Sequence, residues 1–459
     1  MHLASPWTPR LAAEGRPCER LVAAIAEDIA DGALARGDRL PPHRDLAYRL
    51  GIGLGTVTKA YAALERRGLV QSVRGRGMFV AGLAPRTDGV IDLGVNMPPQ
   101  VLDNRLLAAT LVRLAKRLDA GTFGAFTPAA GRPEHRAQAA GWLAGQRLEV
   151  EADCLLLCNG AQHALSVAFA TACPPGGVLL TEAATFPGAL MLARDSGLRP
   201  VGLALDGEGI MPEALEAALR SPAVIGAAPV LYVTPTLNNP TAATMGAARR
   251  RDIVRLCRRH DVTIVEDDVY SLFAGPDLPP LAALAPERTL YVSGLSKSVS
   301  PGLRMGMLAV PRPLVERALS RLQATSTMAS ALSSAIMAEW LTDGTAHSVA
   351  ASIRLDTARR HEMLASLLPV PWPEGPKGFH VWLPMPTDTA ERLASEAAAM
   401  GVILMPPRLP LVDPAAPESG LRLSLGTPPI DKLKQALAVL AALPIGPAAA
   451  LAIAEAAPT

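Results

Sequence analysis

Aromatic residues, cysteines and charged residues are all scarce in this sequence. Phe, Trp and Tyr make up 4% of the 459 residues and charged residues 19%, whereas 49% are apolar. Such an apolar content excludes a disordered chain. The five cysteines are scattered and no pair has zinc-finger spacing, so we expect buried reduced thiols, no disulfide framework and no metal site. These cysteines are Cys18, Cys154, Cys158, Cys173 and Cys257.

The sequence also has no apolar leader and no uninterrupted membrane-length run. The first seventeen residues include Arg10 and Glu14 and lack the apolar core of a signal peptide. The Ala-rich run over 435–456 is broken by Pro444 and Pro447, and its leucines have the spacing of an amphipathic helix. We therefore expect a cytoplasmic protein with no membrane partner.

Positive charge is concentrated in one stretch. The whole chain has a net charge of +2, but residues 36–76 hold nine Lys and Arg against three Asp and Glu, a local charge of +6. The rest of the chain is therefore weakly acidic, at about −4. A chain of 459 residues is too long to fold around one simple hydrophobic core, so two or three domains are expected. The basic stretch predicts a module that binds nucleic acid.

The first eighty residues have the pattern of three short helices followed by a hairpin. Two β-prone runs flank a tip that contains Arg74, Gly75 and Arg76. This combination predicts a winged helix-turn-helix, whose third helix suits the major groove. A three-helix packing module with solvated arginines is the alternative. The predicted elements are a helix that ends near Gly32, helices over 43–50 and 56–67, and strands over 69–73 and 78–81.

One stretch, GDRLPPHRDLAYRLGIGLGTVTKAYAALERRGLVQSVRGRGMFV, resembles the DNA-binding domain of the GntR family. The shared features are LPP-x-R, G-x-x-x-G-T-V-x-K-A-Y and a G-L-V…G-x-G-x-F-V wing. Many relatives have a Ser-Arg pair where this chain has Gly53-Leu54, which removes one expected phosphate or base contact. The resemblance implies DNA contacts from Arg44, Thr56, Thr58, Lys59, Arg74 and Gly75, to which we add Arg76 at the same tip.

Beyond a connector, the chain alternates strand-like apolar runs with amphipathic helices such as 212–219 and 249–260. This alternation predicts an α/β domain with a mostly parallel sheet and ligands at the strand ends. The last hundred or so residues are less regular and predict a small α/β subdomain over about 331–445. The strand candidates are 154–158, 178–181, 230–234, 262–265, 290–293 and 305–310. The expected divisions are 1–16, 17–82, a linker over 83–91, 92–445 and a tail over 446–459.

Polar motifs follow several of these strand candidates. Lys297 lies among small residues after one of them, where desolvation would lower its pKa and favour a Schiff base with an aldehyde. Asp267 ends another strand and could keep a pyridine nitrogen protonated. Tyr270 and Asn239 could both bind a ring oxygen. Taken singly, the alternatives are a surface lysine, an acidic loop or metal site, and a simple turn.

Two further motifs suit a phosphate. Ala161 and Gln162 open a helix directly after a strand, where free backbone N–H groups bind anions. Arg304 follows Lys297 by seven residues and could pair with the same phosphate. Together with the lysine, the carboxylate and the phenol, these groups point to one cofactor, pyridoxal 5'-phosphate (PLP).

The order and spacing of these motifs resemble those of fold type I PLP enzymes of the class I/II aminotransferase family, over roughly Asp92 to Pro444. The resemblance implies an internal aldimine at Lys297, pairing of Asp267 with the pyridinium nitrogen, and Asn239 and Tyr270 on the ring oxygen. It also implies that Arg422 binds a substrate carboxylate, although an ordinary strand arginine is the alternative. The implied phosphate and stacking residues are Ala161, Gln162, Ser296, Arg304 and Phe186.

A GntR-like domain followed by an aminotransferase-like domain resembles the MocR subfamily of regulators. The resemblance implies a DNA-binding transcriptional regulator that senses an amino compound, or PLP itself, through an aldimine at Lys297. It also implies a domain-swapped homodimer on a double-stranded DNA operator. An active aminotransferase with an appended DNA-binding domain is the alternative. Ala161, Gly294 and Phe126 stand where relatives have hydroxyl groups, so we expect transamination to be weak or absent.

Overall fold

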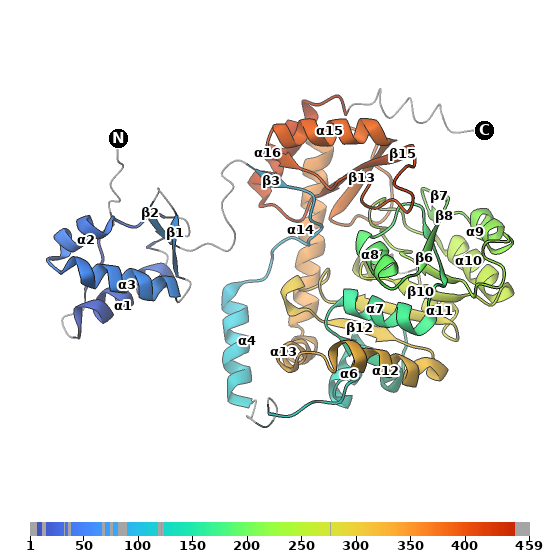
Figure 1. The fold of residues 1–459 in the computed structure, drawn as a ribbon, viewed down its shortest axis with the longest axis horizontal. Coiled ribbons are helices and arrows are strands. Elements are labelled where there is room, and N and C mark those ends of the chain that lie inside the picture. Colours follow the sequence, from blue (N-terminus) through green and yellow to red (C-terminus); the bar gives the residue numbers. More distant parts are fainter. Residues whose placement is uncertain are drawn as a thin grey trace. The chain divides into compact units, whose positions relative to one another are not determined.

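Two compact units make up the chain, Met1–Gly89 and Val90–Thr459 (Figure 1). The computed structural model describes residues 7–11, 15–31, 33–34, 38–66, 69–73, 77–80, 90–117, 121, 124–275 and 277–445. Within these residues, none of the helices has both the length and the apolar composition needed to cross a bilayer.

The first unit is a winged helix-turn-helix, as predicted. Its helices are α1 (Pro17–Ala30), α2 (His43–Leu50) and α3 (Leu54–Arg66), and its hairpin pairs β1 (Val70–Val73) with β2 (Gly77–Val80) antiparallel. The apolar stripes of all three helices meet in one core that includes Leu21, Leu46, Tyr61 and Val80. Helix α3 begins two residues earlier than predicted, because the Gly53 carbonyl accepts the first helical hydrogen bonds from the Thr56 and Val57 amides.

A seven-stranded sheet forms the centre of the second unit. Most of its strands are continuous runs of buried residues, which is typical of a sheet covered on both faces. Every neighbouring pair is parallel except those made by β12, which is antiparallel to both β11 and β4. In spatial order the strands are β4 (Leu155–Cys158), β12 (Gly306–Ala309), β11 (Thr289–Gly294), β10 (Thr263–Asp267), β9 (Val230–Val233), β5 (Val178–Glu182) and β6 (Arg199–Leu203).

Helices cover both faces of this sheet (Figure 1). Successive residues of a strand point into the cores on opposite faces of the sheet, so Leu156 packs in one core and Leu157 in the other. One face is covered by α7 (Ala161–Ala172), α8 (Pro187–Asp195) and α12 (Val315–Ser326). The other is covered by α6 (Pro133–Ala144), α9 (Pro212–Leu219), α10 (Ala247–Arg259), α11 (Leu281–Leu284) and α13 (Ala331–Thr342). Outside these layers lie α4 (Asn104–Arg117) and the short hairpin of β7 (Leu205–Asp206) and β8 (Gly209–Ile210).

A smaller subdomain contains its own core. Its strands β13 (His380–Pro386) and β15 (Glu418–Ser424) pair antiparallel. The helices α14 (Thr345–Leu367), α15 (Thr387–Ala399) and α16 (Ile430–Ala441) pack around them. The structure adds a segment that the sequence did not assign to this subdomain: β3 (Ile91–Asp92) pairs parallel with β14 (Val402–Ile403), and Leu93 enters the same core.

Candidate cofactor site

The candidate site lies at the edge of the sheet where four parallel strands end. Strands β4, β9, β10 and β11 all finish there, and antiparallel β12 begins there, as the alignment of Cys158, Gly306 and Gly294 shows. This edge and the loops that leave it carry the predicted residues except Arg422, which lies on β15 (Glu418–Ser424). Strand direction therefore brings together side chains that lie up to about 140 residues apart in sequence.

Lys297 lies three residues after the end of β11 and is partly buried. Its Nζ donates a hydrogen bond to the carbonyl of Asn96 and lies 6.0 Å from the centroid of the Phe379 ring. Burial, followed by the charge of Arg422, lowers the pKa of Lys297 to about 8. A substantial share of the amine is thus neutral close to neutral pH, as a nucleophile toward an aldehyde must be.

Asp267 is the acidic residue of its cluster that faces the site. Strand alternation turns Glu266 to the opposite face, where it accepts from the amides of Leu281 and Ala282. Asp267 Oδ2 accepts from the Tyr232 hydroxyl at 3.0 Å, while its buried Oδ1 has no partner among the described residues. Burial raises the pKa of Asp267 to about 7. An unpaired buried carboxylate oxygen suits a protonated ring nitrogen.

Tyr270, Asn239 and Arg422 are also buried. Arg422, on β15, donates through Nη1 to Asn239 Oδ1 at 2.8 Å and through Nη2 to the carbonyl of Gly94. Its Nε is buried without a partner in the described part of the chain. The guanidinium that was predicted to bind a carboxylate is therefore present, and neutral oxygens surround it.

The other end of the site is built around the start of α7. Gly160 has a φ of 86°, and a Cβ there would lie 2.5 Å from Nη2 of Arg304. Only glycine lets this guanidinium approach the free N–H groups of the helix start so closely. The Ser296 hydroxyl is buried and has no described partner. Gly294 and Ala161, two of the positions that lack hydroxyls, are neighbours, since a Cβ on Gly294 would lie 3.5 Å from that of Ala161.

Gln162 and Phe186 lie near this end. Gln162 Nε2 donates to the carbonyl of Gly188 at 2.8 Å, and Phe186 precedes α8 and is half-buried. Gly188 in turn lies against the Phe186 ring, because a Cβ added there would come within 2.5 Å of it. The side-chain amide of Gln162 is thus engaged by backbone, which leaves its own N–H at the helix start as the group available to an anion.

Sequence reasoning missed several residues that contact the site, among them Gly94, Asn96 and His380. The first two follow β3, and His380 begins β13 beside Tyr270, with ring centroids 5.3 Å apart. Burial lowers the pKa of His380 to about 3, so this imidazole is neutral. The polar Asn96 between apolar Val95 and Met97-Pro98 was the one available signal in the sequence.

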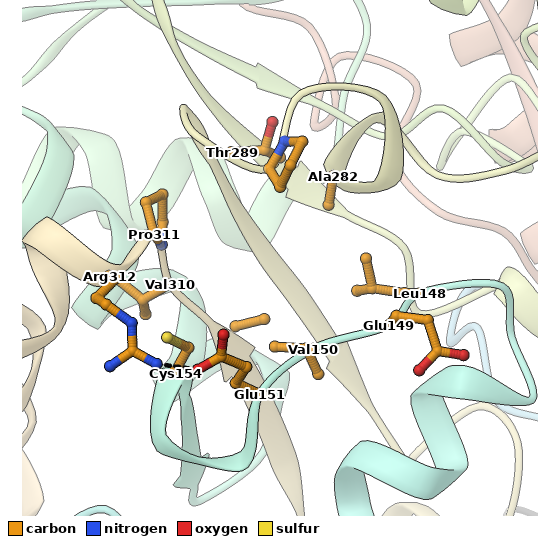
Figure 2. Close-up of a pocket in the computed structure, with 12 residues that line it drawn as sticks. Leu148, Glu149, Val150, Glu151, Cys154, Ala282, Thr289, Val310, Pro311 and Arg312 are labelled. Atoms are coloured by element: carbon orange, nitrogen blue, oxygen red, sulfur yellow. Dashed lines mark hydrogen bonds and ion pairs between the residues drawn. The ribbon is translucent and has the colours of Figure 1, made fainter.

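Several cavities lie in the described part of the chain, and one of them reaches His380 of the site. Figure 2 shows a pocket of about 220 Å³, where Glu151 and Arg312 form an ion pair near Cys154. A larger cavity of about 690 Å³ lies between the β7–β8 hairpin and the small subdomain and is lined by Trp372, Trp382 and His380, among others. Neither pocket is lined by Lys297 or Asp267.

The predicted DNA-contacting residues of the first unit lie on α2 and α3. Arg44, Thr58 and Lys59 are exposed and Thr56 is half-buried. The Thr58 hydroxyl donates to the carbonyl of Leu54, one turn earlier. The hairpin-tip residues Arg74, Gly75 and Arg76 lie outside the described residues.

Comparison with known proteins agrees with both halves of this architecture. Residues 88–440 match the family "Aminotransferase class I and II", and residues 17–80 match "Bacterial regulatory proteins, gntR family". The chain belongs to the MocR subfamily of GntR-type transcriptional regulators. Its fold is accordingly a winged helix-turn-helix joined to a fold type I aminotransferase domain.

Relatives of this MocR protein share its full length. The HTH-type transcriptional regulator YdeF of Bacillus subtilis is 27% identical, over 95% of this chain and 96% of its own. The vitamin B6 salvage pathway transcriptional repressor PtsJ of Salmonella typhimurium is 28% identical, over 90% and 95%. Among solved structures, an archaeal alanine:glyoxylate aminotransferase superposes with a TM-score of 0.71 at 22% identity, covering 84% of this chain and 94% of that one. This last likeness concerns the fold.

Proposed function

We propose that this MocR regulator holds PLP on Lys297, binds an operator through α3 and the hairpin, and changes its DNA affinity when an effector enters the cofactor site. The effector is an amino compound or PLP itself. One observation carries the proposal: a lysine with a lowered pKa shares a site with a buried carboxylate whose second oxygen has no described partner.

The residues present fit the cofactor. Three buried polar atoms of the site lack partners among the described residues: Asp267 Oδ1, Ser296 Oγ and Arg422 Nε. They match the ring nitrogen, the phosphate and the carboxylate of an amino acid, respectively. Buried polar atoms are rarely left unpaired, so each supports a ligand at its position.

Bound PLP supplies an electron sink for the carbon next to a ligand's amine. Lys297 would provide the amine that holds the cofactor, and Asp267 would keep its ring nitrogen protonated. Tyr270 and Asn239 would bind the ring oxygen, and Phe186 would contact the ring. Arg304, Ser296 and the α7 start at Ala161 and Gln162 would neutralise the phosphate, and Arg422 would orient a carboxylate.

The relatives support a regulatory role for this site. PtsJ is named as a repressor of vitamin B6 salvage, which favours a B6 vitamer as one candidate effector. The proposed assembly is a homodimer in which each DNA-binding unit lies against the other chain. Phe126 is 83% exposed in the single chain, as expected of a residue that a second subunit covers.

An active aminotransferase is the second candidate, because the amine, the carboxylate and the arginine are all retained. The absence of hydroxyls at Ala161, Gly294 and Phe126 weakens the hold on a cofactor that is not covalently attached. Each hydrogen bond to a charged group contributes about 1.5–3 kcal/mol, so slow or absent turnover is expected. Sustained turnover of single amino acids with a keto acid, at about 1–10³ per second, would favour the enzyme.

The test of cofactor binding is spectroscopic. The purified protein should be yellow, and Lys297→Ala should abolish its visible absorbance, whereas Lys377→Ala, an exposed lysine of the same unit, should leave it unchanged. A Lys297→Ala protein with the wild-type spectrum would refute the assignment. Titrating labelled duplex DNA with and without candidate effectors then tests the regulatory part of the proposal.

A further inference from the structure

Asn96 makes three contacts with residues of the cofactor site. It is 8% exposed and lies four residues after β3. Its carbonyl accepts from Lys297 Nζ, and its Nδ2 donates to the Tyr270 hydroxyl at 2.7 Å. Its Oδ1 accepts from the Ser424 hydroxyl at 3.1 Å. One residue therefore contacts the lysine, the phenol and the strand that carries Arg422.

We propose that Asn96 is a positioning residue: it donates to the Tyr270 oxygen and so leaves the phenolic hydrogen free to be donated to the cofactor. This inference rests on the proposed function, because it assigns a direction to one hydrogen bond of the PLP site. Asn96 belongs to neither the sheet edge nor the motifs from which the site was predicted.

The orientation of the Asn96 side-chain amide follows from its contact with Ser424. The Ser424 side chain is fully buried, and its hydroxyl makes no other hydrogen bond with the described residues. The Asn96 amide oxygen must therefore face Ser424, which turns its NH₂ group toward Tyr270. With the amide reversed, the Ser424 hydrogen would be buried and unpaired, at a cost comparable to a lost hydrogen bond.

The Tyr270 hydroxyl has one hydrogen, and the contacts described around it give that hydrogen no acceptor. Its oxygen already accepts from Asn96, and the nearby Arg422 offers only donors. Asn239 Oδ1 accepts from Arg422. Burial raises the pKa of Tyr270 well above its ordinary value, so the hydrogen stays in place at working pH. An acceptor in the site, such as an anionic ring oxygen, is the group this hydroxyl can serve.

The consequence is measurable in the chromophore. A donor to the ring oxygen favours the more negative form of bound PLP and lowers the pH midpoint of its visible band. The N–H that Asn96 donates polarises the Tyr270 hydroxyl, so this hydroxyl becomes a stronger donor to the ring oxygen and lowers the midpoint further. The charged or titratable groups near Tyr270 are Asp267, Lys297, Arg422 and His380. Asn96→Ala leaves all four in place and adds no charge, whereas Asn96→Asp adds a carboxyl group.

The experiment titrates the visible band of the full-length PLP-loaded protein. Asn96→Asp keeps the shape but replaces the donor by an acceptor that takes the Tyr270 hydrogen. We expect its midpoint to rise by about half to one pH unit, which corresponds to one hydrogen bond. Asn96→Ala should give a smaller rise. In a Tyr270→Phe protein, whose own midpoint is raised, Asn96→Ala should add nothing.

Thr427→Val is the matched control. It removes the neighbouring hydrogen bond from Thr427 Oγ1 to the Val95 carbonyl without touching Tyr270 or Lys297. The midpoint of Thr427→Val should match that of the wild type. A rise equal to that of Asn96→Asp would show that any loosening of this segment shifts the band, and it would overturn the proposal. An unchanged midpoint in Asn96→Asp, or additive effects of the Asn96 and Tyr270→Phe substitutions, would also overturn it. If Asn96→Asp does not fold, Ser424→Ala, which frees the amide, should still raise the midpoint.

These outcomes differ from failure of the proposed function. A wild-type protein that develops no visible band with PLP would refute the cofactor itself. A normal wild-type band with an Asn96-independent midpoint would refute only the role of Asn96.

Discussion

Lys59 on α3 and Lys297 after β11 carry the same ammonium group in opposite surroundings. Lys59 is exposed, on a helix face suited to a DNA backbone. Lys297 is partly buried between Asn96 and Phe379, and its pKa is lowered to about 8. Attraction to phosphates needs a charge that remains in water and releases counterions. Attack on an aldehyde needs an amine that can lose its charge.

The same contrast extends to the neighbours of each lysine. Around Lys297, Asp267 and Arg422 are 4% exposed, and His380 is 1% exposed. Around Lys59, the partners proposed for DNA, Arg44 and Thr58, are exposed. Binding in the first unit should therefore respond chiefly to salt, and binding in the second chiefly to pH and to single buried contacts.

The largest expected effect is that of Arg422→Gln. Removing one partner of a buried ionic contact costs several kcal/mol, so affinity for amino acids should fall about 30-fold or more. The visible band of bound PLP should remain, because Arg422 contacts Asn239 rather than Lys297. Spectral titration with amino acids, and with the matching amines that lack the carboxylate, measures the effect. Equal losses for both ligand classes would contradict the assignment.

Next in size is the effect of Asp267→Asn on the stability of the cofactor-free protein. Burial raises the pKa of Asp267 from 3.8 to about 7, so its charged form destabilises the fold increasingly as the pH rises from about 4 to 7. The free energy of unfolding of Asp267→Asn should exceed that of the wild type by about 2–4 kcal/mol at pH 8 and should equal it at pH 4. Denaturant melts at both pH values test this. Asp277→Asn, at an exposed position, should change neither.

Reaction of Lys297 with PLP should show a third, pH-dependent effect. Because its pKa is about 8, uptake of PLP by the cofactor-free protein should slow about tenfold per pH unit below 8 and level off above it. Stopped-flow absorbance at saturating PLP gives the profile. A plateau reached only near pH 10, the ordinary value for lysine, would show that the burial of Lys297 does not control its reactivity.

The smallest effect is that of Lys59→Ala on DNA binding. Loss of one phosphate contact should lower affinity about tenfold at low salt and reduce the salt slope by about one unit. The visible band should be unaffected. Fluorescence anisotropy over a range of salt concentrations measures both quantities, with Lys377→Ala as the control. A salt slope unchanged in Lys59→Ala would remove this residue from the DNA contacts.

Much of the fold could be predicted from the sequence. All six strand candidates correspond to strands of the sheet, because strands buried on both faces leave continuous apolar runs such as Leu155–Cys158. One helix start was also visible, since Pro212 lies at a first helical position, whereas α3 begins two residues before its predicted start. The first unit followed from three apolar stripes and a basic hairpin.

The unpredicted features depend on contacts between distant segments. Strand β6 begins with exposed residues and lies at the edge of the sheet, so it has no continuous apolar run. The antiparallel insertion of β12 between β11 and β4 is not visible in local periodicity. Asn96 contacts Tyr270 across 174 residues, and no local pattern encodes such a pair. The motifs after the strands were visible because each is local.

The contact between Arg422 and the Gly94 carbonyl would make the proposed binding of a carboxylate partly an exchange. A carboxylate that uses the free Nε together with Nη2 would displace the Gly94 oxygen, so its apparent affinity would be set by the difference between the two partners. Neutral amines would gain nothing from this exchange, so the arginine would act as a filter for acids. The displaced oxygen belongs to a segment that begins, four residues earlier, at Val90, the first residue of this unit. The same exchange would therefore remove one hydrogen bond that holds this segment in place.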